Sequence, residues 1–234
     1  MKFTRSRTIG LGRAKQNIVR GMLVAIAALA AAGIASAQED KDVAASSQLQ
    51  APISSALVTP IEGNSVFLAG HAFGTQGYVC LPTSTGASWT VNSARPEATL
   101  FTNVFGEAVQ IITHFLSPDA NPNEFAPSPL PFGNATWQSS FDSSKVWAQA
   151  TKVIPAGTTA NCPNSGSIPC LVLQSIGTQE GPTGGKILAK TTFVERLNTN
   201  GGAAPATGCS VFTDVGKQSL VPYTADSFFF RADQ

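Results

Sequence analysis

The sequence is poor in the groups that most enzymes use for chemistry. Only two of its 234 residues are histidines, and charged residues make up 12% of the chain. It contains no Gly-x-Ser-x-Gly elbow of a serine hydrolase and no Gly-x-Gly-x-x-Gly fingerprint for a dinucleotide. The segment Gly181–Lys186 is like a phosphate-binding loop, but it is one residue short, and Ile187 follows where Ser or Thr would bind magnesium. We therefore expect no cofactor.

No apolar run in the chain reaches the roughly 20 residues that span a bilayer. The longest, Met22 to Ile34, follows six basic residues with no acid among them and is closed by Ala35-Ser36-Ala37. A basic region, an apolar region and a small-residue site in this order are typical of a secretory signal peptide, and a retained anchor is the alternative. The predicted division is a signal peptide at 1–37, a flexible lead-in at 38–55 and one β-rich domain at 56–234.

Clustered basic residues are also absent after the predicted signal peptide. The remaining chain has nine basic and 14 acidic residues, a net charge of −5. Nucleic-acid binding needs a clustered basic face. We therefore expect a secreted or periplasmic protein without a nucleic-acid partner and without a membrane span in the mature chain.

The four cysteines form neither a Cys-x-x-Cys pair nor a histidine-rich cluster, so no metal site is predicted. An oxidising compartment favours disulfides instead, and four cysteines allow three pairings. Cys162 and Cys170 flank a turn-rich loop that can bring its ends together, which favours a bridge between them. Cys80 and Cys209 would then form a second, long-range bridge.

Capped helices with apolar residues at three-four spacing are absent after residue 40. Short apolar or alternating runs recur instead between glycines and prolines. Strands are predicted near 56–60, 65–72, 75–81, 87–91, 98–102, 107–116, 144–154, 170–176, 186–197 and 224–231. Many short strands without interleaved helices predict an all-β fold, a single-domain antiparallel β-sandwich or barrel-like fold.

Residues 117–135 interrupt the strand pattern with five prolines. Prolines at this density exclude a helix or a central strand, so a long proline-rich loop is predicted here. The loop is either a binding arm that carries Phe125 and Phe132 or a tolerated insertion, and we favour the insertion.

Two groups of residues are candidate ligand-binding residues, and no catalytic residue is assigned. The first group is His114, Trp137, Asp142 and Lys145. His114 lies on the more polar face of its predicted strand. The four side chains would lie on one rim of the fold if the proline-rich loop only connects neighbouring strands. A surface histidine, a packed tryptophan and a turn aspartate are the structural alternative.

The second group is Arg196, Asn198 and Asp226. Arg196 and Asn198 end a strand just before two glycines. Arg196 is predicted to pair with a carboxylate, Asp226 first and Glu195 second, and could instead hold a ligand. A tight structural turn is the alternative, and we favour the structural alternative for both groups.

At the second group the sequence resembles a known family. The run Arg196-Leu-Asn-Thr-x-Gly-Gly-x-Ala-Pro-x-x-Gly-Cys209, followed by Val221-Pro-Tyr-Thr-Ala-Asp226, is similar to secreted bacterial and fungal proteins catalogued as domain of unknown function 3455. Further matches are Pro96-Glu-Ala-Thr-Leu100, Gly106, His114-Phe115, Trp137, Asp142-Ser-Ser-Lys145-Val146 and Ile168-Pro-x-Leu-x-Leu173. The resemblance covers roughly Leu57 to Arg231. It implies no established activity, and a malate dehydrogenase label that some fungal relatives carry does not suit a chain without a nucleotide fingerprint.

This chain departs from the family pattern at two places. The proline-rich loop replaces a much shorter connection, and Ser143 stands where relatives tend to have glycine. Our expectation is a disulfide-stabilised, non-enzymatic binding or envelope-associated module with a carbohydrate or another envelope component as its ligand. The alternative is an extracytoplasmic hydrolase of sugar or ester bonds that uses carboxylates and His114.

Overall fold

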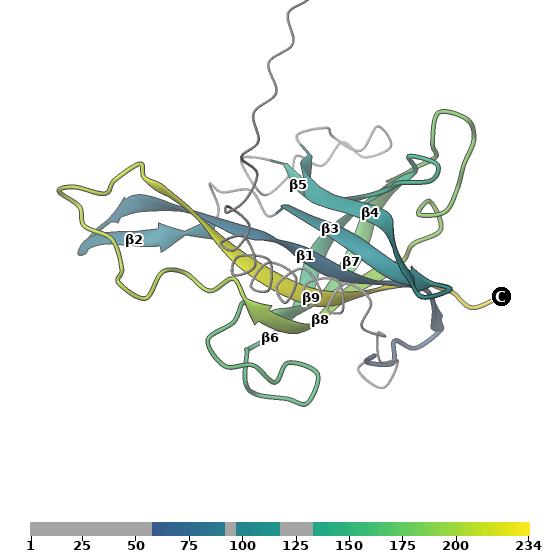
Figure 1. The fold of residues 1–234 in the computed structure, drawn as a ribbon, viewed down its shortest axis with the longest axis horizontal. Coiled ribbons are helices and arrows are strands. Elements are labelled where there is room, and N and C mark those ends of the chain that lie inside the picture. The colour runs from purple at the N-terminus through teal and green to yellow at the C-terminus, as the bar shows by residue number, and fades with distance from the viewer. Residues whose placement is uncertain (1–57, 92–96, 118–132) are drawn as a thin grey trace, which may run out of the picture. The chain divides into compact units, whose positions relative to one another are not determined.

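A computed structural model describes residues 58–91, 97–117 and 133–234, and this part of the chain is built of strands, turns and loops without an α-helix (Figure 1). No helix in it could therefore span a membrane. The predicted signal peptide, the lead-in and residues 118–132 of the predicted loop lie outside the described residues. The strands are β1 (Asn64–Thr83), β2 (Gly86–Thr90), β3 (Glu97–Val104), β4 (Glu107–Ser117), β5 (Asn134–Ser139), β6 (Lys145–Ile154), β7 (Cys170–Gln179), β8 (Phe193–Gly201) and β9 (Gln218–Ala232).

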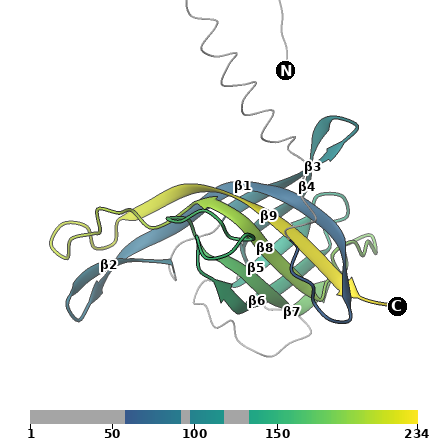
Figure 2. The same cartoon turned by 90° about the horizontal axis from the view of Figure 1, so that it is seen from below.

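The described strands form one antiparallel sheet that closes on itself, which confirms the all-β, barrel-like prediction. Their order is β2-β1-β3-β4-β5-β6-β7-β8-β9, and β9 pairs in turn with β1. The long β1 makes the closure possible, because one edge of it pairs with β9 while its other edge pairs first with β3 and then with β2. Figure 2 shows β1 and β9 running side by side across the sheet.

β1 is a single strand where two were predicted on either side of Gly74. A Cβ at Gly74 would lie 2.0 Å from the Glu97 carbonyl oxygen. The glycine therefore permits the close approach of β3 and does not end the strand. Two further predicted segments, 58–60 and 186–192, are not strand, and β5 was not predicted.

The larger hydrophobic cluster lies inside the closed sheet. Each of the strands β1 and β3 to β9 contributes at least one buried side chain to this cluster. Side chains from all the strands of a closed sheet can contact one another only on the inside of the ring. Among these residues are Ala72, Leu100, Ile112, Trp137, Val146, Leu173, Val194, Ala225 and Phe229. We call this side of the sheet the inner face.

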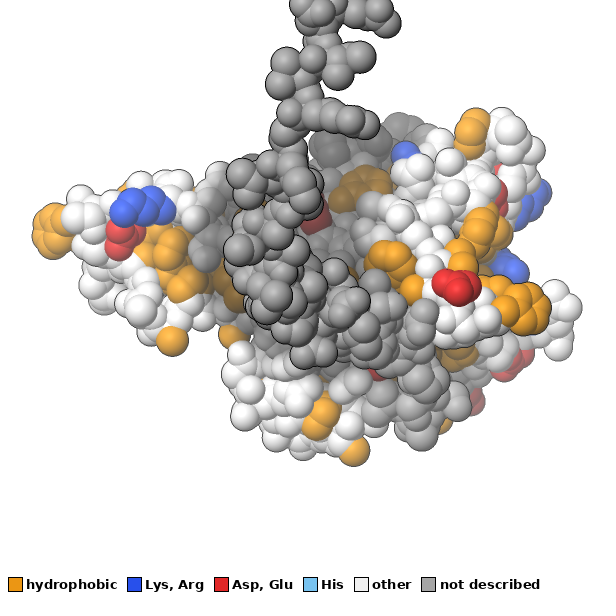
Figure 3. All heavy atoms as spheres, viewed as in Figure 1, with side chains coloured by type: hydrophobic (Ala, Val, Ile, Leu, Met, Phe, Trp, Pro, Cys, Tyr) orange, Lys and Arg blue, Asp and Glu red, His pale blue; other side chains and the backbone are white. Residues whose placement is uncertain are grey.

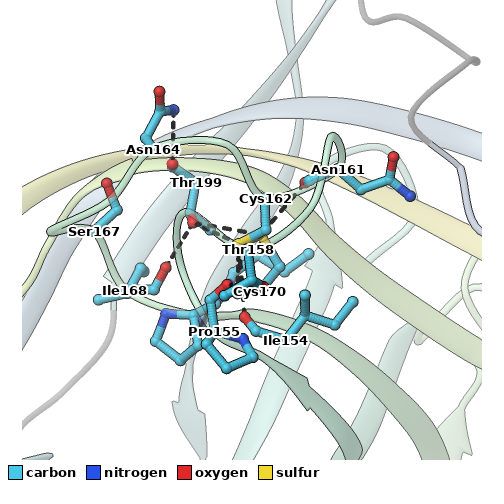
Figure 4. Close-up of a disulfide and its surroundings, with 12 residues drawn as sticks. Ile154, Pro155, Thr158, Asn161, Cys162, Asn164, Ser167, Ile168, Cys170 and Thr199 are labelled. Atoms are coloured by element: carbon cyan, nitrogen blue, oxygen red, sulfur yellow. Dashed lines mark hydrogen bonds between the residues drawn. A yellow bond between two sulfur atoms is a disulfide. The ribbon is translucent and has the colours of Figure 1, made fainter.

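A second cluster lies on the outer face of β8 and β9. It contains Leu197, Phe228 and Phe230, and it is covered by residues 155–169 and by the segment around Val58 and Ile61. The cover is fastened by the Cys162–Cys170 disulfide and by the Thr199 hydroxyl, which donates to the Ile168 carbonyl at 2.6 Å (Figure 4). Burial on both faces explains why β9 reads as a continuous apolar run, Phe228-Phe-Phe230.

β1, β2 and the start of β9 project beyond the ring as an arm, on the left in Figure 1. The second predicted disulfide, Cys80–Cys209, joins the 202–217 loop to this arm, so both favoured pairings are confirmed. Figure 3 shows hydrophobic side chains at this end of the molecule. The exposed ones there are Val91, Val211, Phe212, Val215 and Leu220.

Candidate functional site

His114 and Trp137 form a stacked pair on the inner face. They are direct cross-strand neighbours on β4 and β5, with ring centroids 4.3 Å apart and an interplanar angle of 13°. The prediction that His114 lies on a polar face was wrong, because the side chain is 5% exposed. The bulge between β3 and β4 leaves Ile111 without a cross-strand partner and shifts the alternation of inner and outer residues.

His114 is an uncharged hydrogen-bonding group in this position. Its Nδ1–H donates to the Thr136 carbonyl at 2.9 Å. Burial lowers the pKa of His114 to about 4, and the positive charge of Arg196 adds to that effect. The ring is therefore neutral at neutral pH, with Nε2 left as an acceptor.

Asp142 holds two turns together instead of joining the His114–Trp137 pair. One carboxylate oxygen accepts from the Ser144 amide and hydroxyl, and the other accepts from the Ile187 amide at 2.9 Å. Burial would raise the pKa of Asp142, but these hydrogen bonds outweigh it and lower the pKa to about 2. Asp142 thus fastens the 180–188 loop to the β5–β6 turn. Lys145 begins β6 opposite Gln138 and Gln179.

Arg196 also faces inward. Its Nη2 donates to the Pro169 carbonyl at 2.9 Å, and its guanidinium bonds to the Tyr223 hydroxyl. The predicted Arg196–Asp226 ion pair was wrong. Arg196 lies across from Ser227, and Asp226 lies across from Leu197. Side chains alternate between the two faces of a strand, so Arg196 and Asp226 point to opposite sides of the sheet.

Asp226 belongs to a polar group on the outer face. Its Oδ1 accepts from Nδ1 of His71 at 2.6 Å, and its Oδ2 accepts from the Asn198 amide at 3.0 Å. Asn198 has a positive φ of 49° at a bulge in the β8–β9 pairing. The bulge aims the Asn198 side chain at Asp226. The structure therefore joins two of the predicted site residues to His71, which was not predicted.

Two phenylalanines extend this polar group across the outer face. Phe101 is the direct cross-strand neighbour of His71, and Phe73 is two residues further along β1. The Phe73 ring meets the His71 ring edge-on at 4.9 Å and the Phe101 ring at 6.3 Å. All three side chains are partly exposed. The sequence signal was the alternation in His71-Ala72-Phe73, which places the histidine and the phenylalanine on one face.

A buried carboxyl lies nearer the cover on the same face. Glu195 is fully buried, and its Oε2 accepts from the Thr59 amide at 3.0 Å. Burial raises the pKa of Glu195 to about 7, against the lowering effects of the Thr59 hydrogen bonds and the Lys152 charge. Across the described ranges, no three His, Cys, Asp or Glu side chains are grouped so that they could hold a metal ion.

Comparison with known proteins places the chain in a family. The family model described as "Protein of unknown function (DUF3455)" matches residues 61–231, and the chain belongs to this family. No curated protein matches the sequence, and no solved structure matches the fold. The function must therefore be argued from the two faces of the sheet.

Proposed function

We propose that this member of the DUF3455 family is an exported, non-enzymatic binding module that holds a neutral polyhydroxylated ligand, such as a sugar chain of the cell envelope, on its outer face. The two disulfides are compatible with an oxidising compartment. The observation that carries the proposal is the partly exposed row of Phe73, Phe101 and His71 beside Asp226.

The three rings supply an apolar surface with polar atoms at its edge. Sugar rings present C–H groups on one side and hydroxyls around the rim, so they can cover an aromatic ring and form hydrogen bonds at once. The His71 Nδ1 is taken up by Asp226. Its Nε2, with no hydrogen-bond partner among the described residues, is left to accept from a ligand hydroxyl.

The charges on this face also favour a neutral ligand. Asp226 is 4% exposed, and its two oxygens are taken up by His71 and Asn198. The neighbours of Phe73 on β3 and β9, Thr99 and Thr224, are uncharged. The next side chain on this face of β3, Glu97 opposite Thr75, is an exposed carboxylate.

Binding can be tested with the exported domain and a panel of soluble neutral oligosaccharides, namely β-glucan, xylan and chitin fragments. We expect one class to bind by isothermal calorimetry, with a loss of at least about tenfold in Phe73→Ala and in Phe101→Ala, because aromatic anchors dominate such surfaces. Phe212→Ala is the matched control, since Phe212 is 93% exposed on the arm. No binding by any class, or an equal loss in Phe212→Ala, would refute the outer-face proposal.

One observation favours a second candidate, a hydrolase centred on His71 in place of His114. A histidine oriented by a carboxylate, which is itself held by an amide, is an arrangement that hydrolases use for a general base. His114 has no such carboxylate among the described residues. Release of p-nitrophenol from p-nitrophenyl acetate by the wild type, abolished in His71→Gln and retained in His114→Gln, would support this candidate over pure binding.

A further inference from the structure

The inner face carries a guanidinium without a carboxylate partner in the part of the chain that the structure describes. Arg196 is partly buried beside the Tyr223 hydroxyl and the Pro169 carbonyl, both of them neutral. Its Nε is buried and has no hydrogen-bond partner among the described residues. An unpaired buried charge is costly, and an unpartnered buried donor adds to that cost.

The nearest carboxylates along β8 and β9 cannot compensate this charge. Glu195 precedes Arg196 in the strand and therefore faces outward, where it meets Thr59. Asp226 also faces outward and is taken up by His71 and Asn198. The same register that builds the outer polar group thus leaves Arg196 without a carboxylate partner among the described residues.

Two tyrosines lie beside Arg196. Tyr78 and Tyr223 lie close enough for their hydroxyl groups to influence its pKa, which burial lowers and the phenol oxygens raise. The Tyr78 hydroxyl donates to the Gly202 carbonyl at 2.5 Å, which fixes that ring. On the side of His114, Trp137 meets Phe229 edge-on at 6.3 Å.

We infer that Arg196 is the anchor of an interior binding site for a small organic monocarboxylate with an apolar or aromatic body. Arg196 supplies one positive charge, and His114 is a neutral neighbour whose pKa responds to it. One cation balances one carboxylate, whereas a phosphate dianion would leave a buried negative charge. A guanidinium offers a carboxylate two parallel N–H donors, and the ligand body would lie against Trp137 and the tyrosines.

This site is independent of the outer-face proposal, because the two lie on opposite sides of the same strands. A sugar that binds outside would be unaffected by Arg196, and a carboxylate that binds inside would be unaffected by Phe73. Each proposal can therefore fail without the other.

The test uses the full exported domain with both disulfides formed and compares benzoate, phenylacetate and hexanoate with their uncharged amides and with inorganic phosphate. We expect the carboxylates to raise the melting temperature in proportion to the logarithm of their concentration, as binding to the folded state requires. The amides and phosphate should bind at least about tenfold more weakly. Equal shifts by each acid and its amide would overturn the inference.

Variants of Arg196 separate a ligand anchor from a structural arginine. Arg196→Lys keeps the charge but loses the paired donors, so we expect at least about tenfold weaker benzoate binding. The exposed Arg231 is the control, and Arg231→Lys should bind as the wild type does. If Arg196→Lys does not fold, the Arg196 Nε–H signal of the wild type in ¹⁵N spectra gives the answer. A shift on benzoate addition supports the site, and an unchanged signal refutes it.

Discussion

The two faces of β8 and β9 differ in the partners that they give to buried charged groups. On the outer face, Asp226 meets His71 and Asn198, and Glu195 meets the Thr59 amide. On the inner face, Arg196 meets only neutral oxygen atoms among the described residues. Taking a charge out of water without an opposite charge beside it costs free energy of folding. The Asp226 group outside is completed by its own side chains, whereas Arg196 Nε inside has no hydrogen-bond partner among the described residues, as is also true of Glu195 Oε1 on the outer face.

The two disulfides offer the strongest way to test this division. Cys80–Cys209 closes 129 residues and joins the arm beside Tyr78, whereas Cys162–Cys170 closes eight and fastens the outer cover. The chain-entropy model gives about 5 kcal/mol for the long bridge and about 2–3 kcal/mol for the short one. We expect Cys80→Ala/Cys209→Ala to lower the free energy of unfolding in urea more than Cys162→Ala/Cys170→Ala does. The reverse order would mean that packing of the outer cover outweighs chain entropy.

Glu195 should make the folded protein less stable as the pH rises. Its folded pKa, about 7, is above the ordinary value of 4.5. The protonated form is thus favoured by folding, and the stabilisation is complete below about pH 4.5 and is lost as the pH rises through 7. We expect roughly 2–3 kcal/mol less stability at pH 8 than at pH 4.5 from this group. Glu195→Gln should remove this part of the pH dependence in urea unfolding, while the exposed Glu180→Gln leaves it unchanged.

His114 should make the folded protein less stable as the pH falls. Burial lowers its pKa from 6.5 to about 4. Its contribution to stability is complete above pH 6.5 and is lost as the pH falls through 4, by roughly 2–3 kcal/mol. His114→Phe keeps a ring against Trp137 and should flatten the acid limb of the stability curve. In the wild type, NMR should place the titration midpoint of His114 near pH 4, and a midpoint near 6.5 would contradict the buried inner position.

The sequence predicted the all-β class and the Cys162–Cys170 disulfide because these depend on local signals, and Cys80–Cys209 followed as the remaining pair. Turns are marked by Gly and Pro, and Cys162 and Cys170 flank a turn-rich loop. The site was harder to predict, because it depends on register. Moving the pairing by one residue exchanges inner and outer side chains. The Arg196–Asp226 prediction failed on this point, and the bulge at Ile111 reversed the predicted face of His114.

The smallest predicted effect concerns Asn198, whose backbone and side chain both serve the outer group. Its φ of 49° is costly for most residues and free for glycine. Its side chain donates to Asp226. Asn198→Ala loses the hydrogen bond and keeps the strained backbone, whereas Asn198→Gly loses only the hydrogen bond. We expect Asn198→Gly to be more stable than Asn198→Ala by about 1 kcal/mol in urea unfolding. Both variants should bind benzoate as the wild type does, because Asn198 lies outside and Arg196 inside. Equal stability of the two variants would mean that the bulge relaxes when the Asn198 side chain is removed. In that case the hydrogen bond to Asp226 holds the Asn198 backbone at its positive φ.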